Sequence, residues 1–382
     1  MNNGSVVCSN CILHHGFLGI ELNPDGLCNY CADPDHKNPN WSKVRISEPI
    51  RSECLRNWDD TVQAMKRKHN GKDYDCVIGY SGGKDSTALV DTFISEYELN
   101  PLLVTVDTGF MTDVAKRNIR DTLTKMELYG NFILIEKAIL TFYKLYKHFF
   151  LNHISNDKTL TVDICHTCTD LIHTIVVKEA IKRNIPIVII GFSPDQIARY
   201  FYETTRENII KDGFLDKKLS HELDATDLKW YLNEKDIAGK IPRLLYPYHV
   251  IEYDEVKIIG RIEAKGLIEI GRGNPVLTNC HVVKAAIVYD FFRYGGIPYA
   301  LQYAELVRQD NRLRKGWLKT VNQVSRAILN GTFNKEGIEL FFKNIGISWE
   351  ELIERIEAQR VSDPNREQIM HNIQLIKDRK LK

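Results

Sequence analysis

The residues best suited to chemistry are a glycine turn and two sets of cysteines. The turn is a run of six residues, Ser81, Gly82, Gly83, Lys84, Asp85 and Ser86, that follows an apolar stretch ending at Tyr80. Two adjacent glycines let the backbone fold tightly, so that its N–H groups point into one concavity. A helix beginning near Ser86 adds partial positive charge and Lys84 adds a full charge. Together these groups favour a phosphate or pyrophosphate.

The hydroxyls of Ser81, Ser86 and Thr87 can donate further hydrogen bonds to such a ligand. The turn differs from the Walker pattern, which needs four residues between its first Gly and Gly-Lys-Ser/Thr. A plain Gly-Gly turn with a helix cap is the alternative. The order of strand, turn, lysine and helix argues against it.

The first cysteine set consists of two Cys-x-x-Cys pairs near the N-terminus. Cys8 and Cys11 form one pair, Cys28 and Cys31 the other, and sixteen residues separate the two pairs. Two such knuckles can place four thiolates tetrahedrally around Zn²⁺. A unit this short cannot fold by burial alone, so the metal would supply its folding free energy. We therefore predict a structural zinc ribbon, with free core cysteines as the alternative.

The second set joins Cys165 and Cys168, in DICHTCTD, with Cys280, far downstream in GNPVLTNCHVV. Three thiolates suit an iron–sulfur cluster with one open iron. They also suit a redox pair, or a zinc ion whose shell is completed by His166 or His281. Unrelated buried cysteines are the remaining alternative.

A parallel sheet would position these residues. From Tyr74 onward, short apolar runs typical of buried strands alternate with helical patterns. Such alternation predicts an α/β fold, with a doubly wound parallel sheet and helices on both faces. Ligands of these sheets bind at the carboxyl ends of the strands, so we expect Cys165 and Cys168 to face the glycine turn. The expected strands are 75–80, 102–107, 131–137 and 185–192.

We expect four regions along the chain. These are a zinc ribbon (1–35), a polar connector (36–70), the α/β domain (71–280) and a helical C-terminal region (281–382). Within the connector and the α/β domain the expected helices are 58–68, 88–98, 114–128, 138–153 and 169–183, and residues 241–269 read as an extended segment followed by a helix. In the C-terminal region the expected helices are 282–294, 316–329, 335–344, 349–359 and 366–380.

Composition excludes several classes of protein. The 382 residues include 51 Lys and Arg against 50 Asp and Glu, a net charge of +1, which gives no global case for nucleic acid or an acidic membrane. No apolar run approaches the ~20 residues of a membrane span. The start, MNNGSVVCSNC, lacks the pattern of a secretory signal, and nine cysteines is an odd count for a disulfide framework. We therefore expect a cytoplasmic protein with reduced thiols and no membrane partner.

SGGKDS at the end of a first strand resembles the PP-loop of the ATP pyrophosphatase superfamily, over about residues 70–270. The resemblance implies an enzyme that uses ATP and Mg²⁺ to adenylate a substrate oxygen, after which a nucleophile displaces AMP. Asp107 matches the family's adenosine-side position, and Gly191 and Asp195 match a Gly-x-x-x-Asp pattern, with Phe192 where many members have His. On this resemblance Lys84 and Asp85 are catalytic, and ATP is bound by Ser81, Gly82, Gly83, Lys84, Asp85, Ser86, Thr87, Asp107, Gly191 and Asp195.

The second cysteine set resembles that of the tRNA thiolation branch, the two-thiouridine and two-thiocytidine synthetases. It implies that Cys165, Cys168 and Cys280 are catalytic and ligate three irons of a 4Fe-4S cluster. The fourth iron would hold a sulfide, so that a sulfur donor and a tRNA acceptor are expected partners. Enzymes of the thiouridine group carry a second, C-terminal ribbon, whereas no cysteine follows Cys280 here.

The N-terminal stretch CSNCILHHGFLGIELNPDGLCNYC is similar to the ribbon of N-acetyl sugar amidotransferases. These enzymes use the same activation but accept ammonia from a partner glutaminase, and they lack the second cysteine set. Sulfur transfer is the favoured hypothesis, and amidotransfer in surface-polysaccharide synthesis is the alternative. The net charge of +1 fits a small-molecule or sugar acceptor better than tRNA. The superfamily resemblance favours a homodimer. A non-catalytic nucleotide-binding and metal-binding module is a third hypothesis, which the intact loop beside a cysteine triad makes least favoured.

Overall fold

The computed structural model describes residues 6–33, 47–152, 164–194, 200–216, 219–278, 280–348, 350–351 and 354. The chain divides into two compact units. The first unit comprises Met1–Lys43, Tyr146–Cys165 and His281–Lys382, and the second comprises Val44–Leu145 and His166–Cys280. Apart from 350, 351 and 354, the two last expected helices, 349–359 and 366–380, lie outside the described residues.

The second unit is built on a six-stranded sheet with the strand order β3-β2-β1-β4-β6-β5. The first five strands in this order pair in parallel, and β5 pairs antiparallel with β6 at the edge. The predicted α/β class with a mostly parallel sheet is confirmed. The strands are β1 (Cys76–Gly79), β2 (Pro101–Val106), β3 (Phe132–Ile135), β4 (Ile187–Ile190), β5 (Glu203–Thr204) and β6 (Arg243–Leu245).

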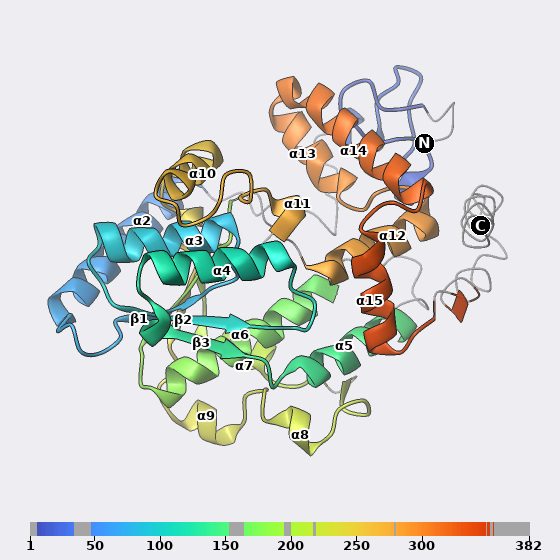
Figure 1. Ribbon diagram of the computed structural model, residues 1–382. Coiled ribbons are helices and arrows are strands. Elements are labelled where there is room, and N and C mark those ends of the chain that lie inside the picture. Colours follow the sequence, from blue (N-terminus) through green and yellow to red (C-terminus); the bar gives the residue numbers. More distant parts are fainter. Residues whose placement is uncertain are drawn as a thin grey trace. The chain divides into compact units, whose positions relative to one another are not determined.

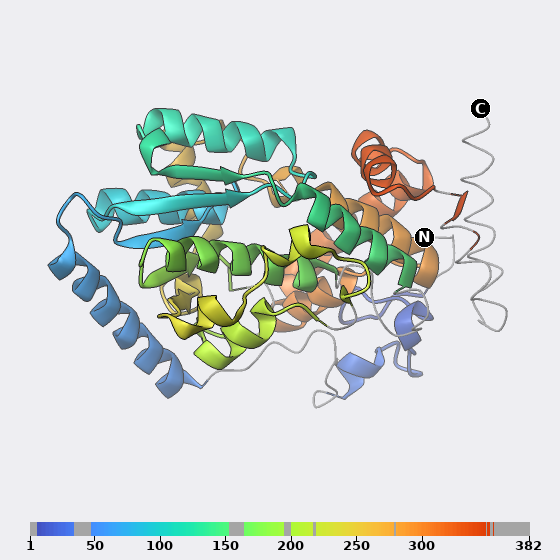
Figure 2. The ribbon, with the colours of Figure 1, turned by 90° about the horizontal axis from the view of Figure 1, so that it is seen from below.

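Helices cover both faces of this sheet (Figures 1 and 2). The helices α3 (Lys84–Asp91) and α4 (Asp113–Lys125) follow β1 and β2 and lie on one face, whereas α6 (Ile164–Lys182) precedes β4 and lies on the other. The chain moves outward from β1 to β3 and then returns to β4 on the other side of β1. Right-handed crossovers therefore place α6 on the opposite face. The reversal between β1 and β4 is the point where doubly wound sheets bind ligands.

Apolar burial explains why these strands form. All six residues of β2 and all four of β4 are buried, as expected for strands covered on both faces. At the edge, β5 is only two residues long and was not expected from the sequence, because so short a strand carries no apolar pattern. It pairs with β6, and β6 together with α10 (Glu255–Ala264) confirms the expected extended segment and helix after residue 241.

The remaining helices of the second unit surround the sheet. The helix α2 begins ten residues before the expected Trp58, because its first half is polar and shows no apolar period. Its Trp58 ring is buried and packs against Phe93, with 6.0 Å between ring centroids. The helices are α2 (Glu48–Lys68), α7 (Arg206–Gly213), α8 (Ala225–Leu228), α9 (Glu234–Ala238), α10 (Glu255–Ala264) and α11 (Pro275–Thr278).

The first unit combines the N-terminal cysteine segment with a helical region. The helix α5 (Ile139–Asn152) runs from the second unit into the first, where Phe150 packs against Tyr289 and Phe341 with centroid distances of 5.6 and 5.1 Å. The helix α13 (Ala300–Gln309) was not expected from the sequence. The other helices of this unit are α1 (Asn29–Ala32), α12 (His281–Tyr294), α14 (Arg314–Leu329) and α15 (Lys335–Ile345). Within the described residues, every helix is too short or too polar to span a bilayer.

Candidate nucleotide and metal sites

The glycine turn lies where the sequence predicts, between the end of β1 and the start of α3. Its two serines close it: Ser81 Oγ lies 3.1 Å from Ser86 Oγ, and Ser86 Oγ donates to Gly83 O at 3.2 Å. Thr87 is fully buried, with its hydroxyl 3.5 Å from that of Tyr80. The serine hydroxyls therefore line the turn, and the threonine hydroxyl lies in the core beneath it.

Gly82 is required by both backbone conformation and space. Its φ is 73°, in the left-handed region. A Cβ there would lie 2.4 Å from Ala115 O and 2.8 Å from Ile119 Cγ1, because the turn is pressed against α4. The Asn118 amide donates to Gly82 O at 3.0 Å and holds this contact. The turn can thus close onto a ligand without a side chain in the way.

The end of β4 packs directly on the first turn of α3. A Cβ at Gly191 would lie 3.2 Å from Ser86 N and 3.1 Å from Leu89 Cδ1, so only glycine fits comfortably. Next to it the Phe192 ring stacks parallel to Tyr246, with 5.6 Å between centroids and 6° between planes. Gly191 therefore joins the turn at the carboxyl edge of the sheet. Its predicted companion Asp195 lies outside the described residues.

Asp107 directly follows β2, at the same sheet edge. It is buried, accepts a hydrogen bond from Gly109 N at 2.7 Å and pairs with Lys116 Nζ at 3.6 Å. A short turn thus fixes this carboxylate at the end of its strand, which is the position that the PP-loop resemblance implies for the adenosine side.

Lys84 and Asp85 start α3 and form a close ion pair, with Lys84 Nζ 2.7 Å from Asp85 Oδ2. Tyr253, just before α10, and Glu255, the first residue of α10, also contact Lys84. Tyr248 OH donates to Asp85 O at 3.1 Å, and burial raises the pKa of Tyr248. Sequence spacing carries no signal for Tyr248, Tyr253 and Glu255, because they contact the turn from 163 to 171 positions away.

The segment leading to Cys280 also lies against the glycine turn. Asn118 donates to Arg272 O at 3.3 Å as well as to Gly82 O, and Thr112 Oγ1 donates to Leu277 O at 2.8 Å. A Cβ at Gly83 would come within 4.0 Å of Thr278 Oγ1. Cys280, which is partly buried, follows two residues later.

Cys165 and Cys168 lie in the first two turns of α6 and are partly buried. The sequence pattern starts this helix at Thr169, because apolar periodicity begins only after the cysteines. Five residues beyond Cys168, His173 packs against Phe192, with 5.5 Å between centroids. Burial raises the pKa of Tyr231, and the nearby Asp227 and Cys168 add to this shift. Cys168 is thus carried by the helix that leads into β4.

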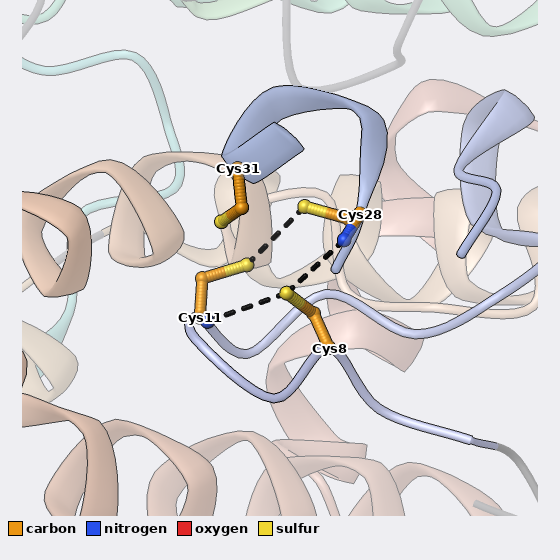
Figure 3. A group of neighbouring side chains, drawn as sticks. All are labelled: Cys8, Cys11, Cys28 and Cys31. Atoms are coloured by element: carbon orange, nitrogen blue, oxygen red, sulfur yellow. Dashed lines mark hydrogen bonds between the residues drawn. The ribbon is translucent and has the colours of Figure 1, made fainter. Parts of the chain in front are cut away.

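The N-terminal cysteines form a compact group (Figure 3). The sulfurs of Cys8, Cys11, Cys28 and Cys31 all lie within 4.8 Å of one another. Among the described residues, no other group of three or more His, Cys, Asp or Glu side chains brings its ligand atoms this close together. The predicted four-cysteine ribbon is therefore assembled. The joint site of Cys165, Cys168 and Cys280 stays a prediction.

The geometry of this group fits Zn²⁺. Cys11 Sγ lies 3.6 Å from Cys28 Sγ, close to the ~3.8 Å between sulfurs expected for tetrahedral Zn–S bonds. Backbone N–H groups also point at the sulfurs: Cys11 N and Cys28 N donate to Cys8 Sγ at 3.5 and 3.2 Å, and Leu13 N donates to Cys11 Sγ at 3.5 Å. Such donors stabilise thiolates and orient metal ligands.

Proton sharing among the four cysteines also favours a bound cation. Hydrogen bonds from the thiols of Cys11 and Cys28 lower the pKa of Cys31 to about 2. Hydrogen bonds with Cys28 and Cys31, together with burial, raise the pKa of Cys11. Four thiols held this closely cannot all ionise unless a cation is present.

The ribbon is anchored to the helical region of its own unit. Arg314, the first residue of α14, donates from Nε to Cys11 O at 2.9 Å and from Nη2 to Cys8 O at 2.8 Å. Asn311 donates to Asn10 O at 3.0 Å. The carbonyls of the first knuckle therefore have fixed partners about 300 residues away in sequence.

Comparison with known proteins gives limited matches. No protein-family model matches the chain. A stretch of 113 residues is 39% identical to an uncharacterized protein of Methanocaldococcus jannaschii and covers 29% of this chain and 36% of that protein. The chain thus matches about a third of the length of this relative. Among solved structures, the U34-tRNA thiolase NcsA from Methanococcus maripaludis, with its 4Fe-4S cluster, aligns with 78% of this chain and 88% of its own at 15% identity, with a TM-score of 0.34.

The class of protein follows from the sheet and the sites themselves. The chain is an α/β protein with a mostly parallel sheet, an N-terminal four-cysteine group compatible with a zinc ribbon, and a helical C-terminal region.

Proposed function

We propose that this protein is an ATP-dependent enzyme that adenylates an acceptor oxygen, releases pyrophosphate and replaces that oxygen with sulfur. The observation that carries the proposal is the glycine turn at the reversal between β1 and β4. There the turn passes through Gly82, in the left-handed region, into the start of α3 at Lys84, and Gly191 at the end of β4 packs on the first turn of that helix. This combination is suited to pyrophosphate.

In this scheme the turn holds the β and γ phosphates of ATP, which arrives with Mg²⁺. Positive charge from Lys84 and the backbone amides stabilises the departing pyrophosphate. Asp107 faces the adenosine side. The acceptor oxygen attacks the α phosphate, so the intermediate is an acyl-type or imidate adenylate. When sulfur displaces it, the acceptor oxygen leaves with AMP.

The second cysteine set supports sulfur as the nucleophile. The segment 272–278 is anchored to α4 by Asn118 and its N-cap Thr112, and Asn118 also bonds Gly82 of the turn; the segment ends two residues before Cys280. Cys168 precedes His173, which packs at the end of β4. Three cysteines from these segments fit a 4Fe-4S cluster, which would supply a bound sulfide. The ribbon would hold a structural Zn²⁺.

Amidotransfer is the second candidate, because the sequence of the assembled four-cysteine ribbon is similar to that of the sugar amidotransferases. The nucleophile would then be ammonia from a partner glutaminase, and the acceptor a sugar. For sulfur transfer the acceptor is tRNA or a small molecule. In either case we propose a cytoplasmic homodimer.

Metal analysis of anaerobically purified protein separates the candidates. Sulfur transfer predicts a brown protein with about four irons per chain besides zinc. We expect Cys280→Ala to lose the iron and keep the zinc, whereas Cys54→Ala, a partly buried cysteine on α2, should keep both. Zinc alone, with ammonium-dependent activity, would refute the sulfur hypothesis.

Adenylation is tested separately by release of AMP and pyrophosphate from ATP in the presence of acceptor. We expect Lys84→Ala to abolish this release while the zinc content stays unchanged. AMP formation at the wild-type rate in this variant would refute the assignment of the turn.

A further inference from the structure

Lys84 is held by three side chains, one from its neighbour in sequence and two from one distant segment. Its Nζ lies 2.7 Å from Asp85 Oδ2, 3.1 Å from Tyr253 OH and 3.5 Å from Glu255 Oε1. Tyr253 OH also donates to Asp85 Oδ1 at 2.8 Å, so one hydroxyl bridges both members of the ion pair. The lysine side chain is only 7% exposed. In this state the ammonium is therefore fully occupied.

The segment that carries Tyr253 and Glu255 is fixed to α3. Arg261, two turns into α10, donates from Nη2 to Ala88 O at 3.2 Å and to Thr92 Oγ1 at 2.9 Å. Lys265 pairs with the buried Asp91 at 2.7 Å. These bonds hold α10 along α3, so the start of α10 stays over the first turn of α3, where Lys84 lies.

The charges around Lys84 oppose an anionic ligand. Two carboxylates surround one ammonium, which gives the group a net charge of −1, whereas a pyrophosphate requires positive charge. Of the two carboxylates, Glu255 is the one that a phosphate can displace from Lys84 more easily. Its contact is the longest of the three and its side chain is 50% exposed, so water can solvate it once it is released. Asp85 is 15% exposed and is held by Tyr253.

We propose that Tyr253 and Glu255 form a clamp on Lys84, in which nucleotide phosphate takes the place of Glu255 while Tyr253 keeps Asp85 in position. Both are positioning residues of the site assigned above, so the proposal rests on the proposed function. The clamp keeps a buried ammonium paired when the site is empty. It lowers affinity for pyrophosphate, because Glu255 must be displaced first, and so favours release of that product.

The test compares Glu255→Gln with Glu252→Gln in the full-length protein. Glu252 is 85% exposed and pairs with Lys257 at 3.4 Å, so its variant removes the same charge nearby without touching Lys84. Calorimetric titration with inorganic pyrophosphate, and with ATP and magnesium, should show about 3- to 10-fold tighter binding for Glu255→Gln and less than about twofold change for Glu252→Gln. The gain should shrink at high salt, as for any partly exposed charge.

A second measurement tests, without nucleotide, how tightly the Lys84 ammonium is held. Amine labelling followed by peptide mass spectrometry should modify Lys84 slowly in the wild type and at least about threefold faster in Glu255→Gln, since the ammonium is then less tightly held. Equal labelling rates would overturn the clamp. Weaker binding of pyrophosphate and ATP by Glu255→Gln would also overturn it, because Glu255 would then support the phosphate or its metal ion.

Failure of the proposed function looks different. If the labelling and pyrophosphate results hold but the wild type releases no AMP from ATP with any acceptor, the clamp stands and adenylation is refuted.

Discussion

The ribbon and the glycine turn are two sites built in opposite ways. The ribbon takes its four ligands from two pairs that lie within 24 residues of sequence, and its N–H···S contacts come from the same short stretch. The glycine turn depends on Asn118, Tyr248 and Tyr253, through contacts that span from 36 to 169 positions. A local site is specified by spacing, whereas a distributed site is specified only by the fold around it.

This difference predicts that the ribbon is broken most completely by loss of one ligand. We expect Cys28→Ser to lose the bound zinc and to leave residues 6–33 sensitive to protease, because metal binding supplies ~10 kcal/mol or more to such small units. Zinc per chain, measured by mass spectrometry, and limited proteolysis check this.

Cys54→Ser is the matched control for the ribbon and should keep its zinc. Full zinc occupancy in Cys28→Ser would contradict the assignment of the ribbon as a four-thiolate site. Because the sheet does not depend on this metal, thermal unfolding of the second unit should change little in either variant.

The glycine turn should be disrupted by adding one methyl group, whereas the ribbon is disrupted by removing one ligand. Gly82→Ala combines a left-handed backbone with a Cβ 2.4 Å from Ala115 O. Together these cost about 2–5 kcal/mol, which corresponds to a loss of AMP formation of about 30-fold or more. Steady-state AMP release checks this.

Gly130→Ala is the control, since a Cβ at Gly130 meets nothing within 4 Å. It should keep wild-type activity. Activity within twofold of wild type in Gly82→Ala would show that the turn does not need the observed backbone to act.

The same contrast explains what the sequence could predict. The four main strands were found because buried parallel strands are continuous apolar runs, and all four are confirmed to within a few residues. The ribbon ligands were found because their spacing encodes the geometry. The short edge strand β5 and the helix α13 were missed, since neither carries a strong local period.

The parts of the nucleotide site that were missed come from tertiary contact. Tyr253 and Glu255 lie in an ordinary polar stretch, YDEVK, and nothing in their spacing relates them to Lys84. They reach it only because Arg261 and Lys265 bind α10 to α3. For Cys165, Cys168 and Cys280 the sequence remains the stronger source, through their number and the Cys-x-x-Cys spacing of the first two.

The smallest expected effect tests whether the ribbon is as local as its spacing suggests. Arg314 holds the carbonyls of Cys8 and Cys11 from outside the ribbon. Removing it in Arg314→Ala leaves all four thiolates in place but frees the first knuckle, so we expect zinc affinity to fall by about tenfold, as for other outer-shell partners. Competition with a coloured chelator measures this. Arg312→Ala, which removes an exposed side chain paired only locally with Asp310, should leave the affinity unchanged. If Arg314→Ala also binds zinc as tightly as the wild type, then spacing alone specifies the ribbon and its anchor serves only to attach it to α14.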